Sequence, residues 1–386
     1  MNFDPADYLP DDLLERIRKR APIHDRENTF AQQDLDELRD AGYLKILVPR
    51  KRGGAGLGLE QATVLQQRLA TASPATALSI NMHLVWTGVA KVFSDRGVPG
   101  MEFVQDGAAE GEVFAFGISE GGNDLVLFGS DTDAVPDGNG GYAFTGTKIF
   151  TSLAPVWTKL GLHGLDTTSP DAPKLVFAFI DRTDAVTTSD DWDTLGMRAT
   201  QSRTTKLDGA IALPEHVVRR IDPGPSPDPI IFGIFSVFEL LLASVYTGIA
   251  RRALDLAVET VHKRTSKKTG LTYSQDPDIR WRIAEMSLVY DALPPQITAL
   301  ARDVDERADH GARWFTLLSG TKHRAVTMAK RVVDEAILTA GGGSYFSSNE
   351  LSRLYRDVLA GMFHPSDPES AHSTAASALL GPPAAP

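Results

Sequence analysis

The stretch that decides the fold begins at Glu112-Val-Phe-Ala-Phe-Gly-Ile118 and ends at Ala212. It contains two further short apolar runs, Tyr142-Ala-Phe-Thr145 and Lys174-Leu-Val-Phe-Ala-Phe-Ile180. Turn residues bound these runs, among them Gly111, Gly121-Gly122 and Pro136-Asp-Gly-Asn-Gly-Gly141. Short runs of β-branched and aromatic residues between turn residues are typical of strands. The sequence therefore predicts a small β domain in this region.

The segments on both sides of this region have helical spacing of apolar residues. Before it, we expect helices over 12–20, ended by Pro22, and over 34–41, 59–69 and 76–93. After it, we expect helices over 230–265, 281–308, 314–339, 349–360 and 371–380. Long consecutive helices favour an up-and-down bundle. We predict an α+β protein with a helical domain at 1–110, a β domain at 111–225, a helical bundle at 226–381 and a disordered tail at 382–386.

Composition excludes several kinds of site. The chain of 386 residues has no cysteine, which rules out disulfides, thiol nucleophiles and thiolate metal sites. A net charge of −11 argues against nucleic acid and anionic membrane surfaces as partners. The first residues lack the pattern of a signal peptide, so we expect a cytoplasmic protein. The run 230–250 has the length of a membrane span, but Glu239 lies inside it, and we expect a helix buried by protein.

Three motifs, in order along the chain, resemble those of one family. They are Asp40-Ala-Gly-Tyr-Leu-Lys-Ile-Leu-Val-Pro-Arg-Lys-Arg-Gly-Gly-Ala-Gly-Leu57, Leu195-Gly-Met-Arg-Ala-Thr-Gln-Ser202 with Leu213-Pro-Glu-His-Val217, and Gly341-Gly-Gly-Ser-Tyr345 with Arg353-Leu-Tyr-Arg-Asp357. The chain resembles acyl-CoA dehydrogenases over roughly 34–381. The resemblance implies a helical domain, a central β-barrel-like domain and a carboxyl-terminal four-helix bundle. It also implies bound FAD and a homotetramer or homodimer.

The resemblance also implies residues for the flavin site. Phe116-Gly-Ile-Ser-Glu-Gly-Gly-Asn-Asp124 stands at the family's flavin loop, and Gly146-Thr-Lys-Ile-Phe-Thr-Ser152 stands at the segment whose aromatic packs on the flavin. The cofactor contacts expected on this basis are Phe116, Ile118, Ser119, Phe150, Ser152, Gly341 and Gly342, with Arg264 reaching the flavin of a neighbouring subunit. Asn123 is expected near the substrate. Lys267 and Leu338 replace an aromatic and a glutamine of the family pattern.

The chain departs from the family at the catalytic base. Pro365 falls where many members have a glutamate, and proline cannot accept a proton. Some members place the base on the first bundle helix, where Phe238 falls here, so its neighbour Glu239 is our candidate base. The alternative for Glu239 is a structural salt bridge with Arg251, Arg252 or Arg356, because buried carboxylates are usually paired. Asp367 and Glu369 are the remaining carboxylates close to Pro365.

His83 is the other polar candidate, on an otherwise apolar helix in the region that roofs the substrate cavity in the family. It is either a substrate contact or a hydrogen-bonded core histidine. The remaining histidines lack ligand spacing, so no metal site is expected. Three functions stay open: an acyl-CoA dehydrogenase that passes electrons to an acceptor flavoprotein, a flavin-dependent monooxygenase on the same fold, and a non-catalytic subunit paired with an active paralogue.

Overall fold

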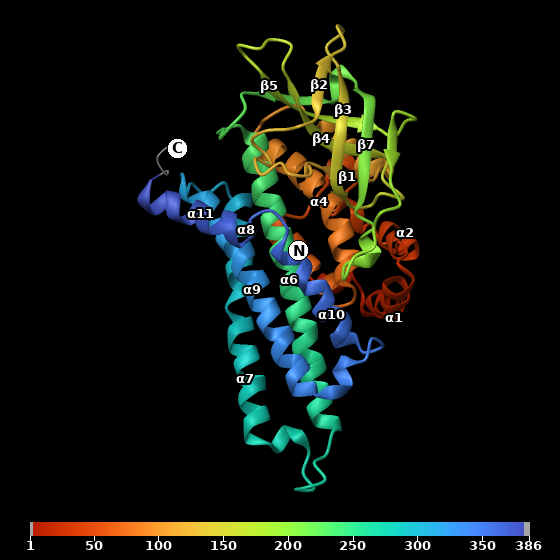
Figure 1. Cartoon of the computed structure of the whole chain (residues 1–386), viewed down its shortest axis with the longest axis vertical. Helices are drawn as coiled ribbons and strands as arrows, with labels where there is room; N and C mark the ends of the chain where they lie inside the picture. The colour runs from red at the N-terminus through yellow and green to blue at the C-terminus, as the bar shows by residue number, and fades with distance from the viewer. Residues whose placement is uncertain (1–2, 382–386) are drawn as a thin grey trace.

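The computed structural model describes residues 3–381 and shows helices, then strands, then helices (Figure 1). The first helices are α1 (Asp11–Glu27), α2 (Gln32–Asp40), α3 (Leu59–Ala70), α4 (Pro74–Asp95) and α5 (Glu102–Glu110). Between α2 and α3 the glycine-rich stretch forms a loop with two short 3-10 turns, Tyr43–Lys45 and Arg50–Arg52. The predicted fold class, with a β region between two helical blocks, is confirmed.

The central region is one mixed sheet. Its strands are β1 (Phe114–Gly117), β2 (Asp133–Pro136), β3 (Tyr142–Thr151), β4 (Lys159–Asp166), β5 (Lys174–Asp181), β6 (Val186–Thr188), β7 (Arg203–Ala212) and β8 (Val217–Ile221). The order is β6-β7-β3-β2-β4-β5-β8, and β1 pairs with β4 in parallel. The path of paired strands does not close on itself, so the expected barrel-like domain is an open sheet. Trp86 of α4 donates its indole N–H to the Ala115 carbonyl (2.9 Å), which fixes β1 on the helical layer.

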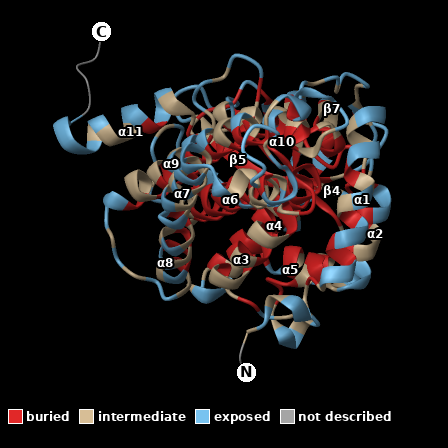
Figure 2. Cartoon of the chain, turned by 90° about the horizontal axis from the view of Figure 1, so that it is seen from below, coloured by how far each residue is buried: buried red, intermediate tan, exposed pale blue. Residues whose placement is uncertain are grey.

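The carboxyl-terminal part is a bundle around one long apolar helix. It comprises α6 (Pro229–Lys263), α7 (Pro277–Asp291), α8 (Leu293–Asp305), α9 (Arg313–Ala340), α10 (Glu350–Leu359) and α11 (Pro368–Leu380). Helix α6 is long and apolar enough to cross a membrane, but 89% of its most apolar window is buried inside the protein. Figure 2 shows α6 and α4 at the buried centre of the molecule. The expectation of a protein-buried helix at 230–250 agrees with this burial.

Two helix boundaries differ from the prediction. Helix α1 continues through Pro22 to Glu27, where Asn28 takes a left-handed conformation. Pro22 removes one backbone hydrogen bond, but the turn after it is held because Asp25 forms an ion pair with Arg356 of α10 (2.5 Å). The single helix expected over 281–308 is two helices, because Pro294 and Pro295 suit the first turn of a new helix. The domain boundaries near 110 and 225 stay predictions.

Candidate functional site

The end of β1 lies between α6 and β3. Phe116 stacks on Phe238 of α6, with ring centroids 5.3 Å apart and planes 25° apart. The Ser119 carbonyl accepts a hydrogen bond from the Ile149 amide (2.9 Å). The fold therefore brings the loop after Phe116 beside the segment that contains Phe150 and Ser152. Ile118 is buried here, whereas Ser119 is partly accessible.

The end of β3 is irregular where the resemblance places the flavin aromatic. Phe150 has a left-handed backbone (φ 57°), and its ring is 55% exposed. Hydroxyl groups line the turn behind it, since Ser152 Oγ lies 2.7 Å from Ser202 Oγ, which lies 2.7 Å from Thr200 Oγ1. The Thr151 hydroxyl is buried without a hydrogen-bond partner. The exposed aromatic ring of Phe150 fits the planar ring of a flavin. The Thr151 hydroxyl is fully buried and does not share that exposed surface.

A buried ion pair, missed from the sequence, fixes the loop after Ser119. Lys148 of β3 donates to Glu120 Oε1 (2.6 Å) and to the His163 carbonyl of β4 (2.8 Å). The same carboxylate accepts from Ser130 Oγ (2.7 Å) and from Thr132 Oγ1 (2.6 Å). Burial raises the pKa of Glu120, but the Lys148 charge and these hydrogen bonds outweigh burial and hold the pKa well below its usual range. The Gly146–Ser152 motif contains Lys148, so this partner of the loop was visible in the sequence.

Asn123 is built into this loop. Its side chain donates to Glu120 Oε2 (2.6 Å) and to the Gly129 carbonyl (3.2 Å), and it accepts from the Leu125 amide (2.9 Å). These bonds use both ends of the amide. The structure therefore gives Asn123 a loop-closing position, and the substrate contact expected for it stays a prediction.

His83 lies in the core. Its Nδ1 accepts from the Phe114 amide (3.1 Å), so the proton is on Nε2, which donates to the Leu44 carbonyl (2.7 Å). Burial lowers the pKa of His83 to about 4. Neither ring nitrogen is available for a substrate. We therefore replace the substrate contact expected for His83 by a structural one, which ties α4 to β1 and to the loop after α2.

Glu239 is buried on α6, directly after Phe238, and contacts the segment 361–367. Its Oε1 accepts from Ser366 Oγ (2.6 Å), and its Oε2 has no hydrogen-bond partner. Burial raises the pKa of Glu239, while the charge of Lys322 on α9 opposes the rise. The expected arginine partners pair elsewhere: Arg251 with Asp255, Arg252 with Glu350 and Arg356 with Asp25. The salt-bridge alternative is therefore wrong for all three arginines.

Phe238, and not Glu239, faces β1. Adjacent helical residues point about 100° apart, so the contact of Phe238 with Phe116 turns Glu239 toward α9 and the segment 361–367. Asp367 caps α11 by accepting from the Ser370 amide (2.8 Å), and Glu369 is exposed. Asp367 and Glu369 therefore supply no free carboxylate beside Pro365, and the carboxyl group that reaches this segment is that of Glu239, through Ser366.

His364, next to Pro365, is the residue that the sequence analysis missed. Its Nε2 is buried without a partner, and its ring lies 5.9 Å from the ring of Tyr246, whose hydroxyl is also buried and unpaired. Burial, with the Lys322 charge second, lowers the pKa of His364 to about 3. The signal was a histidine directly beside the lost glutamate position. A neutral imidazole with one free nitrogen can hold or pass a proton.

The remaining expected cofactor residues meet at the far end of the bundle. Arg264, after α6, donates to the Ala340 carbonyl and lies over the Tyr273 ring, 4.6 Å from its centroid. Gly341 has φ 78°, and a Cβ there would lie 2.9 Å from Arg264 Nη1. Lys267 stands where the family pattern has an aromatic residue, and Tyr273 supplies an aromatic neighbour for Arg264 instead. Gly342 follows on the exposed surface.

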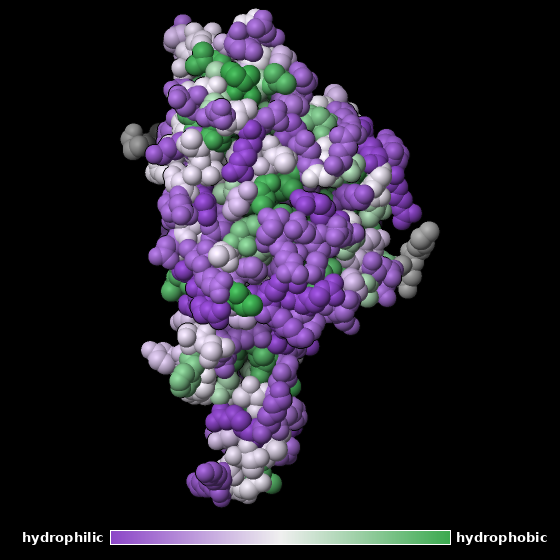
Figure 3. All heavy atoms as spheres, turned by 90° about the vertical axis from the view of Figure 1, so that its right-hand side faces the viewer, coloured by the Kyte–Doolittle hydropathy of each residue, from purple (hydrophilic) through white to green (hydrophobic). Residues whose placement is uncertain are grey.

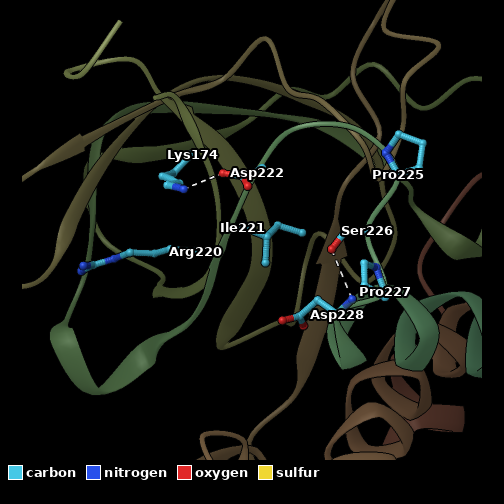
Figure 4. A pocket seen from close by; sticks show the side chains of 8 residues that line it. All are labelled: Lys174, Arg220, Ile221, Asp222, Pro225, Ser226, Pro227 and Asp228. Atoms are coloured by element: carbon cyan, nitrogen blue, oxygen red, sulfur yellow. Dashed lines mark hydrogen bonds and ion pairs between the residues drawn. The ribbon is translucent and has the colours of Figure 1, made fainter. Parts of the chain in front are cut away.

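A separate cavity of about 410 Å³ lies at the end of β8 (Figure 4). Its lining includes Lys174, paired with Asp222 (2.5 Å), and Ser226, which accepts from the Asp228 amide (3.2 Å). None of the expected site residues lines it. We do not assign it to the flavin.

Comparisons with known proteins settle the family. Residues 12–94 match the family model described as acyl-CoA dehydrogenase, N-terminal domain, and residues 240–366 match acyl-CoA dehydrogenase, C-terminal domain. The chain belongs to the acyl-CoA dehydrogenase family. This agrees with the resemblance found in the three sequence motifs.

Curated relatives on this fold have several activities. The chain is 28% identical to L-evernosamine nitrososynthase of a Micromonospora species, over 91% of this chain and 84% of that protein. It is 26% identical to a putative acyl-CoA dehydrogenase of Bacillus subtilis, over 95% and 94%. It is also 26% identical to dibenzothiophene monooxygenase of Rhodococcus qingshengii, over 93% and 88%.

Solved structures share the whole architecture. KijD3 in complex with FMN and a dTDP-linked amino sugar has a TM-score of 0.86 and 26% identity, covering 99% of this chain and 96% of that one. Butyryl-CoA dehydrogenase of Megasphaera elsdenii has a TM-score of 0.85 and 19% identity, covering 98% and 100%. The second comparison supports the fold alone.

Proposed function

We propose that this protein is a flavin-dependent monooxygenase that uses reduced flavin and dioxygen to oxidise a small organic molecule. The observation that carries the proposal is the base position: Pro365 occupies it, Phe238 and not Glu239 stacks on Phe116 of β1, and His364 beside Pro365 has an unpaired nitrogen. The names of the nitrososynthase and dibenzothiophene monooxygenase relatives support the same reaction class. The monooxygenase hypothesis therefore replaces acyl-CoA dehydrogenation as the leading function.

The cofactor we propose is a flavin, as FMN or FAD. The residues that would hold it are Phe116, Ile118, Ser119, Phe150 and Ser152, with Arg264, Gly341 and Gly342 of a second subunit. When bound and reduced, a flavin would supply two electrons and one proton, and with one further proton one atom of dioxygen would enter the substrate while the other would leave as water. The FMN in the KijD3 complex favours FMN over the FAD implied by the family resemblance.

We propose that His364 handles that proton. A neutral imidazole can donate from one ring nitrogen while it accepts at the other. Burial keeps His364 neutral near pH 7, because its pKa is about 3. The ring of Tyr246 packs beside it and limits its orientation.

Acyl-CoA dehydrogenation stays the second candidate. The Bacillus subtilis relative and the family motifs favour it, and buried Glu239 is the carboxyl that would serve as base. The two functions predict opposite results when a thioester is added to the oxidised flavin. A dehydrogenase must bleach its oxidised flavin with a thioester, whereas a monooxygenase must not.

The test is anaerobic addition of butyryl-CoA to protein loaded with oxidised FMN or FAD, followed by absorbance near 450 nm. We expect no bleaching. Bleaching that Glu239→Gln abolishes would establish dehydrogenation and overturn the proposal. Failure of the protein to take up either flavin in equilibrium dialysis would point to the non-catalytic subunit.

We also propose a homodimer or homotetramer. Large apolar side chains are exposed at the end of the bundle that carries Arg264: Trp281, Leu288, Leu338, Tyr345 and Phe346. The ion pair between Arg282 of α7 and Glu335 of α9 (2.7 Å) brings these helix ends together. In Figure 3 the projecting end is mainly purple and white on the face shown, with a few green side chains. A second copy of the chain would cover these apolar side chains and place Arg264 near another subunit's flavin.

A further inference from the structure

The segment 361–367, which carries His364, is held by two buried side chains from two different helices. Glu239 of α6 accepts from Ser366 Oγ (2.6 Å), and Lys322 of α9 donates to three backbone carbonyls of the segment. Both side chains are at most 1% exposed. We call Glu239, Lys322 and Ser366 the brace.

Lys322 forms its hydrogen bonds with the backbone of this segment. Its Nζ donates to the carbonyls of Gly361 (3.0 Å), His364 (2.9 Å) and Ser366 (3.1 Å). An ammonium has three protons, so all of them go to the segment and none to Glu239. Since a buried cation is costly unless it is fully hydrogen-bonded, this arrangement fixes where the segment lies. One of the bonds holds the peptide unit of His364 itself.

Ser366 supplies the contact with Glu239 from a strained position. Its backbone is left-handed (φ 56°), which is uncommon for residues other than glycine. Such a conformation persists only where surrounding bonds determine it. Here the bonds are the hydroxyl to Glu239 and the carbonyl to Lys322.

The packing around the segment is incomplete on one side. A cavity of about 120 Å³ lies against it, lined in part by Lys322, Val326, Gly361 and Ser366. A segment beside an open cavity can shift unless polar bonds anchor it. The brace provides those anchors on the side toward α6 and α9.

We propose that Glu239 and Lys322 are positioning residues for His364, because the brace fixes the segment that carries the imidazole. The proposal rests on the proposed function of His364. It gives a role to the buried carboxyl that family resemblance would assign as the base. It also gives a role to a lysine that the proposed reaction does not otherwise use.

The charges around the imidazole agree with this role. The titratable groups on the packed elements are Glu239 and Tyr246 of α6, Lys322 and His323 of α9, Asp367 of the segment and His372 of α11. Of these, Lys322 is the group whose charge acts on His364, and it lowers the pKa of His364 in addition to burial. Removing Lys322 should therefore let His364 take up a proton at a higher pH.

The test compares Ser366→Ala, Glu239→Gln and Lys322→Met with the wild type and with His364→Ala. Ser244→Ala is the matched control, because Ser244 is also buried on α6 and its hydroxyl bonds only to the Leu240 carbonyl (2.8 Å). Two quantities are measured on each full-length variant. They are the dissociation constant for FMN, from fluorescence quenching, and the rate at which protein-bound reduced FMN is reoxidised in air-saturated buffer across pH.

We expect all variants to bind FMN within about twofold of the wild type, since the brace does not touch the proposed flavin residues. Ser366→Ala and Lys322→Met should change the reoxidation rate by up to about 10²-fold, as small misplacements of a reacting group do. In Lys322→Met the acid limb of the pH profile should move up by about one pH unit or more. Ser244→Ala should behave as the wild type.

The outcomes distinguish an error about the brace from an error about the role of His364. If His364→Ala slows the reaction but Ser366→Ala, Glu239→Gln and Lys322→Met keep wild-type rates and pH profiles, the brace is not a positioning device. If His364→Ala itself behaves as the wild type while binding FMN, the proposed role of His364 is wrong and the brace has nothing to position. Should Lys322→Met fail to fold, Ser366→Ala decides the matter, because it removes the hydroxyl contact of the brace and changes no charged group.

Discussion

Phe238 of α6 stacks on Phe116 of β1 with 5.3 Å between ring centroids, and this contact sets which way Glu239 points. Because the two residues are neighbours on one helix, Glu239 is directed toward Lys322 and Ser366 and away from β1. A base must reach the proton that it removes. Glu239 therefore has a different orientation from a catalytic base located at position 238.

The first prediction concerns the state of Glu239. Burial raises its pKa, so the neutral carboxyl is favoured at neutral pH. Because the pKa is raised in the folded state, the free energy of unfolding falls as the pH rises above the ordinary value of about 4.3. Glutamine mimics the neutral carboxyl and does not carry this loss. We therefore expect Glu239→Gln to be at least as stable as the wild type at pH 7 and to lose any gain in stability as the pH falls to about 4, measured by urea denaturation.

Glu239→Ala is the companion variant. It strands the Ser366 hydroxyl and opens a cavity, and we expect a loss of about 2–4 kcal/mol. If Glu239→Gln lost as much as Glu239→Ala, the carboxylate would be ionised and paired with Lys322. The neutral state would then be excluded.

The second prediction concerns the loop that follows Ser119. Breaking the buried pair of Glu120 and Lys148 leaves one charge without its partner, so Glu120→Gln should cost about 3–5 kcal/mol. The depressed pKa of Glu120 means that its stabilising contribution is present above the unfolded pKa and is lost as pH falls through the folded value. Thermal unfolding at pH 7 measures the loss, and FMN binding should weaken with it.

Exposed Glu369, changed to Gln, is the control. Equal stability of both variants would show that the pair does not hold the loop.

The third prediction is a loss of stability in acid caused by His83. Its folded pKa of about 4 lies below the unfolded value of 6.5, so the unfolded chain binds more protons between these values. The contribution of His83 lowers the free energy of unfolding as the pH falls from 6.5 toward 4, by about 1.4 kcal/mol per pH unit. Above pH 6.5 this loss is absent. Urea titrations at pH 7, 6 and 5 should show a shallower slope in His83→Gln than in the wild type. The exposed histidine His372, changed to Gln, should keep the wild-type slope. An unchanged slope in His83→Gln would mean that His83 is already charged in the fold.

The fourth prediction concerns self-association. If a second copy covers the end of the bundle, Trp281→Ser combined with Leu338→Ser should lower the molar mass measured by light scattering. Leu125→Ser, which removes an exposed leucine from a β-domain loop, should not change it. The double variant should also lose flavin affinity if Arg264 reaches a neighbouring subunit. A wild-type protein that is monomeric at micromolar concentration would contradict the surface assignment.

Much of the architecture could be predicted from local patterns. The spacing of apolar residues located α4, α6 and α9, and the aromatic runs located β1, β3 and β5. The strands β2, β4, β6, β7 and β8 were not placed individually, because their pairing depends on partners far along the chain. Pro22 misled the prediction because a tertiary contact of Asp25 holds the turn after it, and that contact is invisible in a local window.

The site was less predictable for the same reason. The motifs at 195–202 and 353–357 meet in space, where the Met197 amide donates to Asp357 Oδ1 (2.6 Å), but their distance in sequence is long. His83 and Glu239 looked alike as single polar residues on apolar helices. Only the structure shows that His83 uses both nitrogens and that Glu239 leaves one oxygen free. His364 was overlooked because the family pattern drew attention to Pro365 beside it.

The most direct test of the central claim is a single mass-spectrometric experiment. Protein carrying reduced FMN is mixed with ¹⁸O₂ and three probes: dibenzothiophene, a dTDP-linked amino sugar and butyryl-CoA. The account predicts that the sulfur or nitrogen probe gains one labelled oxygen atom per reduced flavin, and that butyryl-CoA is recovered unchanged. Loss of two hydrogens from butyryl-CoA, with no labelled product from the other probes, would contradict it.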